Sequence, residues 1–402
     1  MLPLACSSAF LETAQMKNRT HIRLVTVVAI TILASAARPQ DVQWLQYRSA
    51  SEAYSVVSDI GLQSLAPVGE KPAGVTLPVF TGSEQVFAKW STPMVEAGYL
   101  WMAVDGRNKL FIDSNGNGHL DDQTAMEAYR SAQDSAYFGP VKVVFQGEDG
   151  PVTYHLNIQF YDRPDGKRLY VRTAGWYEGA ITLNGQKKQC MLIDYNANGA
   201  FDDRSVNFDQ CDRIQIGATN AQETRFVGNY IEADGTLYSS EIARDGAYVK
   251  FAKAEGVKLG DVRLPESVTE FAAGGENGLF IRKPEKGQCI LPIGKYRIEH
   301  WTIQRQDDKD AEWKLQGTNF ADAGLFDVNE AQAAELSIGE PIVCALQADQ
   351  REPGTYYFRQ ELKGKLGERI ELTRNNARPQ PPKVQIKSKD GKYDRTFTFE
   401  YG

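Results

Sequence analysis

The sequence predicts a mainly β protein: a hairpin-rich β domain with an internally duplicated strand-loop motif, followed by a C-terminal β-sandwich. Apolar and polar residues alternate with a period of two, most clearly at Tyr154, Leu156, Ile158 and Phe160. Turn dipeptides of the Asp-Gly and Asn-Gly kind recur between strand-like runs. With 402 residues, of which 42% are apolar, the chain can bury a substantial core in two or three domains.

The N-terminal segment, residues 1–36, has the pattern of a secretory signal peptide. A basic stretch over 16–23 precedes an apolar run over 24–33 and the small residues Ala34-Ser-Ala36. Because residues 1–15 lie before the basic stretch, Met16 is the more natural start. The apolar run is about ten residues long, too short to span a bilayer, and no later stretch is longer. We therefore expect an exported protein, periplasmic or extracellular, whose mature chain has no membrane span.

After the signal peptide, the pattern divides the chain into three parts. Residues 37–85 mix short apolar runs with Gly and Pro, and we expect a leader with a short helix over 44–57 and one or two strands. Residues 86–260 are predicted to form the hairpin-rich β domain, with one helix over 123–133, a stretch rich in Ala, Met and Glu. The turns expected in this domain are Asp105-Gly106, Asp149-Gly150, Asp165-Gly166, Asn184-Gly185, Asp234-Gly235 and Asp245-Gly246.

The last part, residues 261–402, also reads as a succession of strands. Phe397, Phe399 and Tyr401 alternate with polar residues, and Asp390-Gly391 marks the turn of a final hairpin. Several short strands separated by turns are typical of a sandwich. A short helix is expected over 330–336.

One motif occurs twice in the β domain. The first copy reads Leu110-Phe-Ile-Asp-Ser-Asn-Gly-Asn-Gly-His-Leu-Asp-Asp122, and the second reads Met191-Leu-Ile-Asp-Tyr-Asn-Ala-Asn-Gly-Ala-Phe-Asp-Asp203. Each follows a predicted β-hairpin whose second strand runs directly into the loop. This arrangement indicates an internal duplication and two equivalent sites.

The oxygen-bearing residues of each loop have the spacing of calcium ligands. Calcium takes six to eight oxygens from a tightly curled loop, with Gly where the backbone turns sharply. The expected ligands are Asp113, Asn115, Asn117, the His119 carbonyl, Asp121 and Asp122 in the first loop, and Asp194, Asn196, Asn198, the Ala200 carbonyl, Asp202 and Asp203 in the second. Asn-Gly alone can mark a polar hairpin turn. A turn needs only two such residues, however, whereas these loops keep five liganding positions in register twice.

The two loops resemble the EF-hand family of calcium loops, and more closely the Asp-x-Asn-x-Asn-Gly loops of dockerin-like and thrombospondin type 3-like repeats. The resemblance covers about 13 residues in each copy, so it implies a ligand, calcium at two sites, and not a whole fold. Two departures stand out. Counting Asp113 and Asp194 as position 1, position 12, where the family places a bidentate carboxylate, is Thr124 in one loop and Ser205 in the other. The segment that enters each loop reads as a strand, where an EF-hand has a helix.

The missing carboxylate predicts weak binding, about 10⁻⁴ to 10⁻³ M, as in extracellular modules. Asp122 and Asp203 themselves, Glu127 and Asp209 are candidates to complete the shells. Without paired helices a calcium sensor is not expected, so we predict a structural role in which the ion holds neighbouring strands.

Four cysteines follow the signal peptide: Cys190, Cys211, Cys289 and Cys344. In an exported chain an even number favours disulfides, and the local pairs Cys190–Cys211 and Cys289–Cys344 are preferred. Four free thiols remain the alternative, since a chain of this size does not need disulfides to fold.

No catalytic residue is assigned, because the sequence contains no His-Glu-x-x-His, Gly-x-Ser-x-Gly, phosphate-loop or Cys-x-x-Cys motif. The net charge of −7, spread along the chain, argues against nucleic-acid binding. The favoured interpretation is an exported calcium-binding module, structural or binding, with a cell-surface glycan or protein as the fitting partner. The alternative is a carbohydrate-binding or glycoside hydrolase-like protein using Trp176, Trp301 or Trp313 as a sugar platform.

Overall fold

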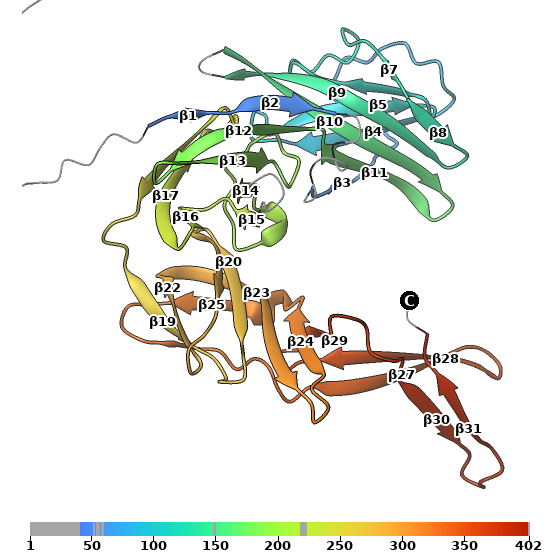
Figure 1. Ribbon diagram of the computed structural model, residues 1–402. Coiled ribbons are helices and arrows are strands. Elements are labelled where there is room, and N and C mark those ends of the chain that lie inside the picture. The colour runs from blue at the N-terminus through green and yellow to red at the C-terminus, as the bar shows by residue number, and fades with distance from the viewer. Residues whose placement is uncertain are drawn as a thin grey trace, which may run out of the picture. The chain divides into compact units, whose positions relative to one another are not determined.

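The computed structural model describes residues 41–50, 53, 57, 60–147, 150–217 and 223–400. The predicted signal peptide and the start at Met16 lie outside these residues. The described part is built of β-strands that pair antiparallel, with one short parallel pairing, and of loops (Figure 1). In it, helical turns are limited to short 3-10 segments such as Phe208–Gln210 and Ala321–Gly324. The mainly β, hairpin-rich class predicted from the sequence is confirmed.

Four antiparallel sheets contain the strands up to residue 253. The first sheet contains, in spatial order, β1 (Gln43–Trp44), β18 (Tyr248–Lys253), β17 (Thr236–Ile242) and β16 (Tyr230–Ala233), and the second contains β3 (Gln63–Leu65), β11 (Gly166–Thr173), β10 (Gly150–Arg163), β9 (Ser135–Gly147) and β8 (Arg130–Ala132). The third contains β15 (Glu223–Phe226), β14 (Arg213–Gly217), β13 (Gln186–Ile193), β12 (Gly175–Leu183) and β2 (Gln46–Ser49). The fourth contains β4 (Gln85–Ser91), β5 (Tyr99–Asp105), β6 (Lys109–Ile112) and β7 (Met126–Glu127). The predicted leader thus supplies β1, β2 and β3 to three of these sheets.

Three further sheets contain the strands from residue 259 onward. One contains β22 (Gln288–Pro292), β19 (Leu259–Arg263) and β26 (Ala334–Glu335). The largest contains, in spatial order, β21 (Gly278–Arg282), β20 (Glu270–Gly275), β23 (Gly294–Gln306), β24 (Glu312–Thr318), β29 (Arg369–Arg374), β28 (Thr355–Lys363) and β27 (Val343–Glu352), and β25 (Leu325–Val328) also pairs with β23. The last is the pair β30 (Lys383–Lys387) and β31 (Asp394–Thr398). The C-terminal sandwich stays a prediction.

The predicted turn dipeptides within the described residues fall between paired strands, as the sequence predicts; Asp149 of Asp149-Gly150 lies outside the described residues. Asp105-Gly106 joins β5 to β6, and Asn184-Gly185 joins β12 to β13. Asn184 and Gly185 both have positive φ, 49° and 77°, as a tight two-residue hairpin turn requires. Asp390-Gly391 lies between β30 and β31. These turns fix the register of each hairpin, and the register decides which side chains face inward.

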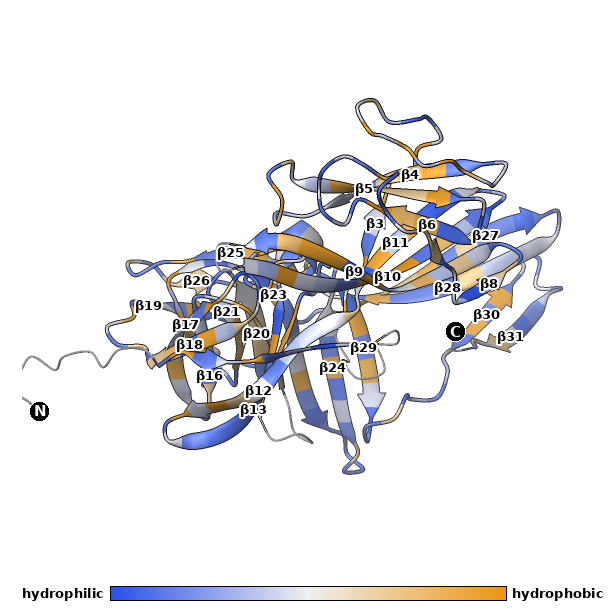
Figure 2. Ribbon diagram, turned by 90° about the horizontal axis from the view of Figure 1, so that it is seen from above, coloured by the Kyte–Doolittle hydropathy of each residue, from blue (hydrophilic) through white to orange (hydrophobic). Residues whose placement is uncertain are grey.

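Buried apolar side chains form two large clusters, one from Leu45 to Val249 and one from Val262 to Ile370. Figure 2 shows apolar and polar residues alternating along many strands. The alternation predicted around Tyr154 is confirmed, because Tyr154 and Phe160 are almost fully buried while His155 between them is only half-buried. Burial of alternate side chains is the main stabilisation available to such sheets.

Two of the three helix predictions, over 123–133 and over 330–336, are wrong. Residues 123–133 contain β7 and β8 instead, because Met126 pairs with Leu110 and Arg130 pairs with Tyr137. Pairing with a neighbouring strand outweighs the helix propensity of Ala, Met and Glu. Residues 330–336 form a turn and β26, and residues 44–49 lie in β1 and β2, with part of the rest of 44–57 outside the described residues.

The disulfide prediction is also wrong, since all four cysteines are free. Cys190 lies in β13 opposite Ile216, and Cys211 is buried elsewhere, with its Sγ donating to the Val227 carbonyl oxygen at 3.4 Å. Burial raises the pKa of the Cys190 thiol to about 12. These two thiols are therefore inert packing groups.

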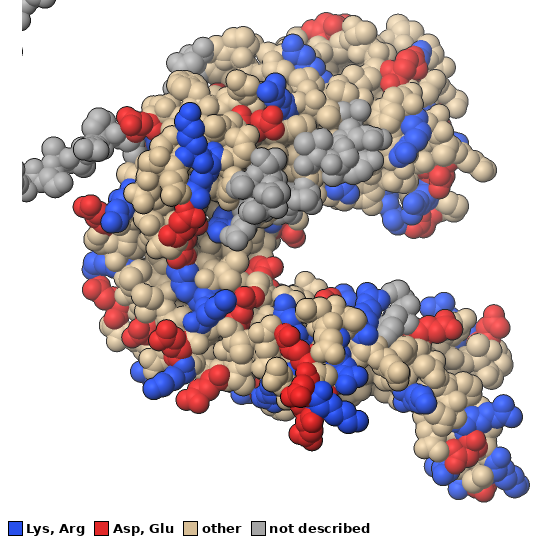
Figure 3. Space-filling view, viewed as in Figure 1, with Lys and Arg blue, Asp and Glu red and all other residues tan. Residues whose placement is uncertain are grey.

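Lysines and arginines are interspersed with aspartates and glutamates over the face of the molecule in Figure 3, and no broad basic stretch is seen there. Among the described residues, none of the helical segments has the length and apolarity needed to cross a bilayer.

Candidate metal centre

Each duplicated loop lies between two paired strands. The first leaves β6 at Ile112 and returns as β7, which pairs with β6; the second leaves β13 at Ile193 and returns as β14, which pairs with β13. The strand entry predicted from the sequence is confirmed. The returning strand was not predicted in either copy, and it makes the repeated unit a three-stranded meander with the loop between its last two strands.

The second loop is organised around the carboxylate of Asp194, which is fully buried. Its Oδ1 accepts from the Asn198 N–H at 3.2 Å, and its Oδ2 accepts from the Gly199 N–H at 2.6 Å and from the Tyr154 hydroxyl at 2.7 Å. Burial raises the pKa of Asp194 to about 7, and the nearby Asp203 charge adds to the rise, although the hydrogen bonds oppose it. A buried carboxylate of this kind has a large gain from a nearby cation.

The residues at positions 1, 3, 5 and 10 of each loop are called its ladder. In the second loop the side chains at positions 3 and 5 converge on Asp203 at position 10. The side-chain amides of Asn196 and Asn198 donate to Asp203 Oδ2 at 2.9 and 2.6 Å. Their amide oxygens accept from the backbone N–H groups of Asn198 and Ala200 at 3.1 and 2.8 Å. Since an amide oxygen has two lone pairs, each keeps one free for a cation. Positions 1, 3, 5 and 10 are thus joined in one network.

The first loop repeats this network with the same atoms. Asp113 Oδ1 and Oδ2 accept from the N–H groups of Asn117 and Gly118 at 3.0 and 2.9 Å. The Asn117 amide donates to Asp122 Oδ2 at 2.8 Å, and the Asn115 amide approaches the same oxygen at 3.5 Å. Only Asp113 of these five is buried. The ladder is therefore the same, but its surroundings are open to solvent.

Position 8 anchors each loop to the core. Leu120 and Phe201 are almost fully buried, and their N–H groups donate to the carbonyl oxygens of Thr76 and Arg244 at 2.8 and 2.9 Å. In the first loop the Thr76 N–H also donates to the Gly118 carbonyl oxygen at 3.1 Å. Each loop is thus held at its middle by a segment distant in sequence.

The aspartates at position 9 have other charged neighbours. Asp121 forms an exposed ion pair with His119, at 3.4 Å between Oδ1 and Nδ1. Burial and the Asp203 charge raise the pKa of Asp202, while the arginines Arg244 and Arg204 lower it.

The two more distant candidates for completing the shells lie on the surface. Glu127 is exposed in β7, opposite Lys109, and Asp209 is exposed in the 3-10 helix Phe208–Gln210. Four acids were predicted from the sequence as candidates to complete the calcium shells. Of these, only Asp122 and Asp203, at position 10, are hydrogen-bonded to the other loop residues in the described structure.

One buried acid escaped the sequence reasoning. Asp212 is fully buried, and its Oδ1 and Oδ2 accept from the N–H groups of Tyr195 and Asp203 at 3.0 and 2.9 Å. Burial raises its pKa well above the usual range, and the charges of Asp194 and Asp203 add to the rise. It lies outside the loop motif, directly before β14, so only the pairing of Ile193 with Arg213 brings it to the loop.

The first loop uses a neutral group at the equivalent place. Gln123 Oε1 accepts from the Ser114 hydroxyl at 2.6 Å and from the Ser114 N–H at 3.4 Å. Ser114 and Tyr195 both occupy position 2 of their loops. A carboxylate therefore supports position 2 in the buried loop and an amide supports it in the exposed one.

Two tryptophans considered as sugar platforms lie in the core. Trp176 is 6% exposed with its Nε1 donating to Glu178 at 3.0 Å, and Trp301 is 0% exposed with its Nε1 donating to Glu368 at 2.9 Å. Neither ring offers a face for stacking on a sugar. Trp313 is half-buried and lines a surface cleft.

The donor set of the loops fits a hard cation. The ladder side chains carry carboxylate and amide oxygens, which calcium prefers, and no thiolate or imidazole nitrogen. Within the described residues no group of three His, Cys, Asp or Glu side chains has the arrangement of a metal site; loops of this type, however, draw half of their ligands from amide and carbonyl oxygens. No protein-family model, no curated protein and no solved structure matches the chain, so the loops alone support a functional assignment.

Proposed function

We propose that this protein is an exported calcium-binding protein whose two EF-hand-like loops stabilise a β scaffold that acts as a structural or binding module. One calcium ion would be held by Asp113, Asn115, Asn117, the His119 carbonyl, Asp121 and Asp122, and the other by Asp194, Asn196, Asn198, the Ala200 carbonyl, Asp202 and Asp203. The signal-peptide pattern over residues 1–36 supports a periplasmic or extracellular location, where calcium is plentiful.

The observation that carries this proposal is the repetition of one hydrogen-bond ladder at two places. In both loops the carboxylate at position 1 accepts from the N–H groups of positions 5 and 6, and the amides at positions 3 and 5 turn toward the acid at position 10. A simple polar turn does not need this convergence. It gathers two carboxylates and two side-chain amides within one curled loop, a set of oxygen donors that a divalent cation can stabilise.

The energetic consequence follows from linkage. A cation that binds only the folded chain adds RT ln(1 + [Ca²⁺]/Kd), about 1.4 kcal/mol per site at ten times Kd. The ion would join β6 to β7 and β13 to β14 across each loop. This is a structural role, because the loops lack the paired helices through which a sensor opens.

Calorimetric titration of the mature chain, residues 37–402, with calcium tests the proposal, together with its melting temperature in calcium and in chelator. We expect heat of binding for two sites and a melting temperature several degrees higher in millimolar calcium. Magnesium at the same concentration should give a smaller rise, since it dehydrates reluctantly and demands a smaller, octahedral site.

Two substitutions and a matched control locate the sites. Asp113→Ala and Asp194→Ala should each remove one site from the titration. Asp165→Ala, at an exposed hairpin turn where Asp165 pairs with Arg168, should leave both sites intact. Absence of calcium heat and of any melting shift in the unmodified chain would overturn the proposal. A response that survives the double substitution Asp113→Ala/Asp194→Ala would place the ion elsewhere.

A further inference from the structure

Strand β29 is paired along only one of its edges. All six of its residues pair with β24, from Thr318↔Arg369 to Trp313↔Arg374. On the other edge its pairing with β28 is limited to Lys363↔Arg369, next to the turn that joins the two strands. Beyond that point β28 diverges while continuing to pair with β27. Among the strands that the structure describes, none pairs with residues 370–373 on this side.

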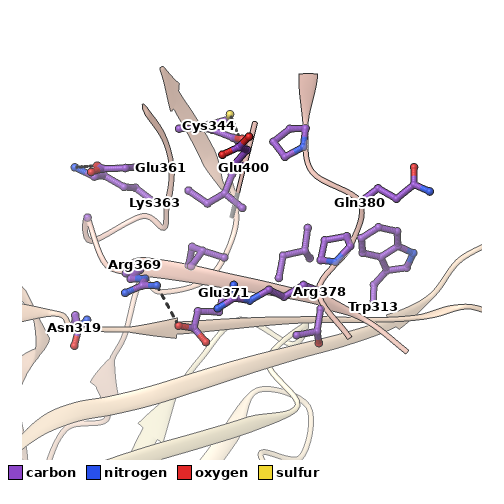
Figure 4. Close-up of a pocket in the computed structure, with 18 residues that line it drawn as sticks. Trp313, Asn319, Cys344, Glu361, Lys363, Arg369, Glu371, Arg378, Gln380 and Glu400 are labelled. Atoms are coloured by element: carbon purple, nitrogen blue, oxygen red, sulfur yellow. Dashed lines mark hydrogen bonds and ion pairs between the residues drawn. The ribbon is translucent and has the colours of Figure 1, made fainter. Parts of the chain in front are cut away.

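A cleft of about 940 Å³ opens where the two strands diverge (Figure 4). Its wall includes every residue from Arg369 to Thr373 and every residue from Gln360 to Lys363. Consecutive residues of a strand point to opposite faces of the sheet. A run of consecutive residues can line one cleft only if the cleft faces the edge of the strand, so both walls present backbone N–H and C=O groups.

The side chains along this edge alternate in character. Ile370 and Leu372 lie on one face and are buried or half-buried, whereas Arg369 and Glu371 lie on the other and are exposed. An exposed strand edge is a template for another strand. An extended segment with apolar residues on one side and polar residues on the other would pair with the backbone N–H and C=O groups of this edge and match the alternation of its side chains.

Strand β31 has these properties. Within the described part of the chain it pairs with β30 alone, in a two-stranded sheet, and no described strand pairs with its other edge. Each of its five residues is exposed, and Phe397 is 44% exposed. Phe397 shares its side of β31 with Arg395, and Phe399 follows it on that side just after the strand, while Thr396 and Thr398 lie on the other side. A separate two-stranded hairpin is marginally stable in water, so its apolar residues gain from being covered.

We infer that the free edge of β29 binds β31 of a second copy of this chain by strand addition. Backbone hydrogen bonds between the two edges supply the affinity, and Phe397 covers the apolar side of the cleft beside Leu372. Because the donor strand and the acceptor edge lie at different places on the chain, the contact is heterologous. It propagates from copy to copy unless the rotation between copies closes a ring.

The first experiment measures the molar mass of the full mature chain by analytical ultracentrifugation over a range of micromolar concentrations, in chelator so that calcium plays no part. We expect mass to rise with concentration. Phe397→Ser changes a fully exposed strand and should leave the melting temperature unchanged while weakening association about tenfold, a loss of about 1.4 kcal/mol. Tyr393→Ser, at an equally exposed residue before β31, is the matched control and should associate as the unmodified chain does.

The second experiment uses Cys344, an exposed free thiol that lines the cleft. Glu400 of the same chain also lines this cleft, so in a Thr398→Cys variant the new cysteine can join Cys344 within one copy, which leaves a monomer, or Cys344 of another copy. The inference requires the second outcome, with dimers and longer species on a non-reducing gel after mild oxidation. Peptide mapping identifies the joined pair. The same variant carrying Cys344→Ser should not form that pair.

A labelled peptide spanning residues 392–400 provides a third measurement, since it should bind the chain and compete with association. The same peptide with Thr396→Pro, which cannot form the ladder, should not bind. A chain that stays monomeric at every concentration overturns the inference. So does a cleft that binds unrelated extended peptides or a soluble oligosaccharide while ignoring the 392–400 peptide.

Discussion

The two calcium-type loops contain the same ladder of hydrogen bonds in opposite surroundings. In the first loop Asn115, Asn117 and Asp122 are exposed, whereas in the second Asn196 is 7% exposed and Asp194 is fully buried. A hydrogen bond broken at the surface is replaced by water, but one broken in the interior leaves a polar group unpaired. The same motif is therefore a surface feature in one copy and part of the core in the other.

Neighbouring strands produce this difference. The second loop receives the Tyr154 hydroxyl from β10, and the Trp90 Nε1 of β4 donates to the Ala197 carbonyl oxygen at 2.7 Å. It also receives the Asp212 carboxylate from the segment before β14. At position 2 the first loop is held by the Gln123 side chain and by the Val144 N–H of β9, which donates to the Ser114 carbonyl oxygen at 3.2 Å; neither group is charged. Equivalent substitutions in the two loops should thus have unequal effects.

The largest inequality is expected at position 2. Asp212→Ala removes a fully buried carboxylate and leaves two partly buried N–H groups, those of Tyr195 and Asp203, without this acceptor, and we expect a loss of about 2–5 kcal/mol of unfolding free energy. Gln123→Ala removes one neutral acceptor from Ser114 in the more exposed loop and should lower the unfolding free energy by about 0.5–1 kcal/mol. Urea unfolding at saturating calcium measures both. Equal losses would contradict the contrast between the loops.

The next largest inequality is expected at the glycine of position 6. Gly118 and Gly199 both have positive φ, 79° and 92°. A Cβ at Gly199 would lie 3.0 Å from the Phe145 ring, whereas at Gly118 its nearest neighbour is the Gly74 carbonyl oxygen at 3.8 Å. Gly118→Ala should therefore lower the unfolding free energy by about 1–2 kcal/mol, because only the strain of a positive φ is added. Gly199→Ala should cost about 2–4 kcal/mol because overpacking is added. Thermal melts of the two variants compare them directly.

A smaller effect is expected from Tyr154→Phe, which keeps the ring and removes one hydroxyl. Asp194 loses a buried donor, and hydrogen bonds to charged groups contribute about 1.5–3 kcal/mol. Tyr161→Phe removes a half-exposed hydroxyl bonded to Tyr137 and should change stability by less than about 1 kcal/mol. If the two variants have the same melting temperature, the Tyr154 hydroxyl does not stabilise the second loop.

Much of the fold was predictable because it is encoded locally. Asp-Gly and Asn-Gly pairs set the hairpin turns, and the alternation around Tyr154 set the buried face of β10. The duplicated spacing from Asp113 and from Asp194 places positions 1, 3, 5 and 10 in one hydrogen-bond network in each loop, while the calcium ligation predicted for these residues stays a prediction. These features depend on residues only a few positions apart.

The rest depended on pairing between distant segments. Residues 123–133 became strands because β6 and β9 offered free edges, which no propensity reveals. Asp212 joined the second loop through the pairing of β13 with β14. The two loops differ at six of their 13 positions, and the second is the more apolar because Tyr195, Ala197 and Ala200 replace Ser114, Gly116 and His119. This difference is a local signal that the second loop would be the buried one. That outcome is set by Tyr154 and Phe145, which lie in other strands.

The smallest expected difference concerns calcium itself, on the proposal that both loops bind it. The second loop holds Asp194 in the interior with Asp203 and Asp212 nearby, so solvent screens their attraction for a cation less than it does around Asp122. We expect the second site to bind about tenfold more tightly, a difference of about 1.4 kcal/mol.

Calorimetry should therefore resolve two steps in the unmodified chain. Asp203→Asn should remove the tighter step, and Asp122→Asn the weaker one. Raising the ionic strength should weaken the exposed site more than the buried one, because salt screens exposed charges first. If Asp122→Asn removes the tighter step instead, burial opposes calcium binding in this scaffold, since the cost of dehydrating the ion in the second loop then exceeds the gain from its less screened carboxylates.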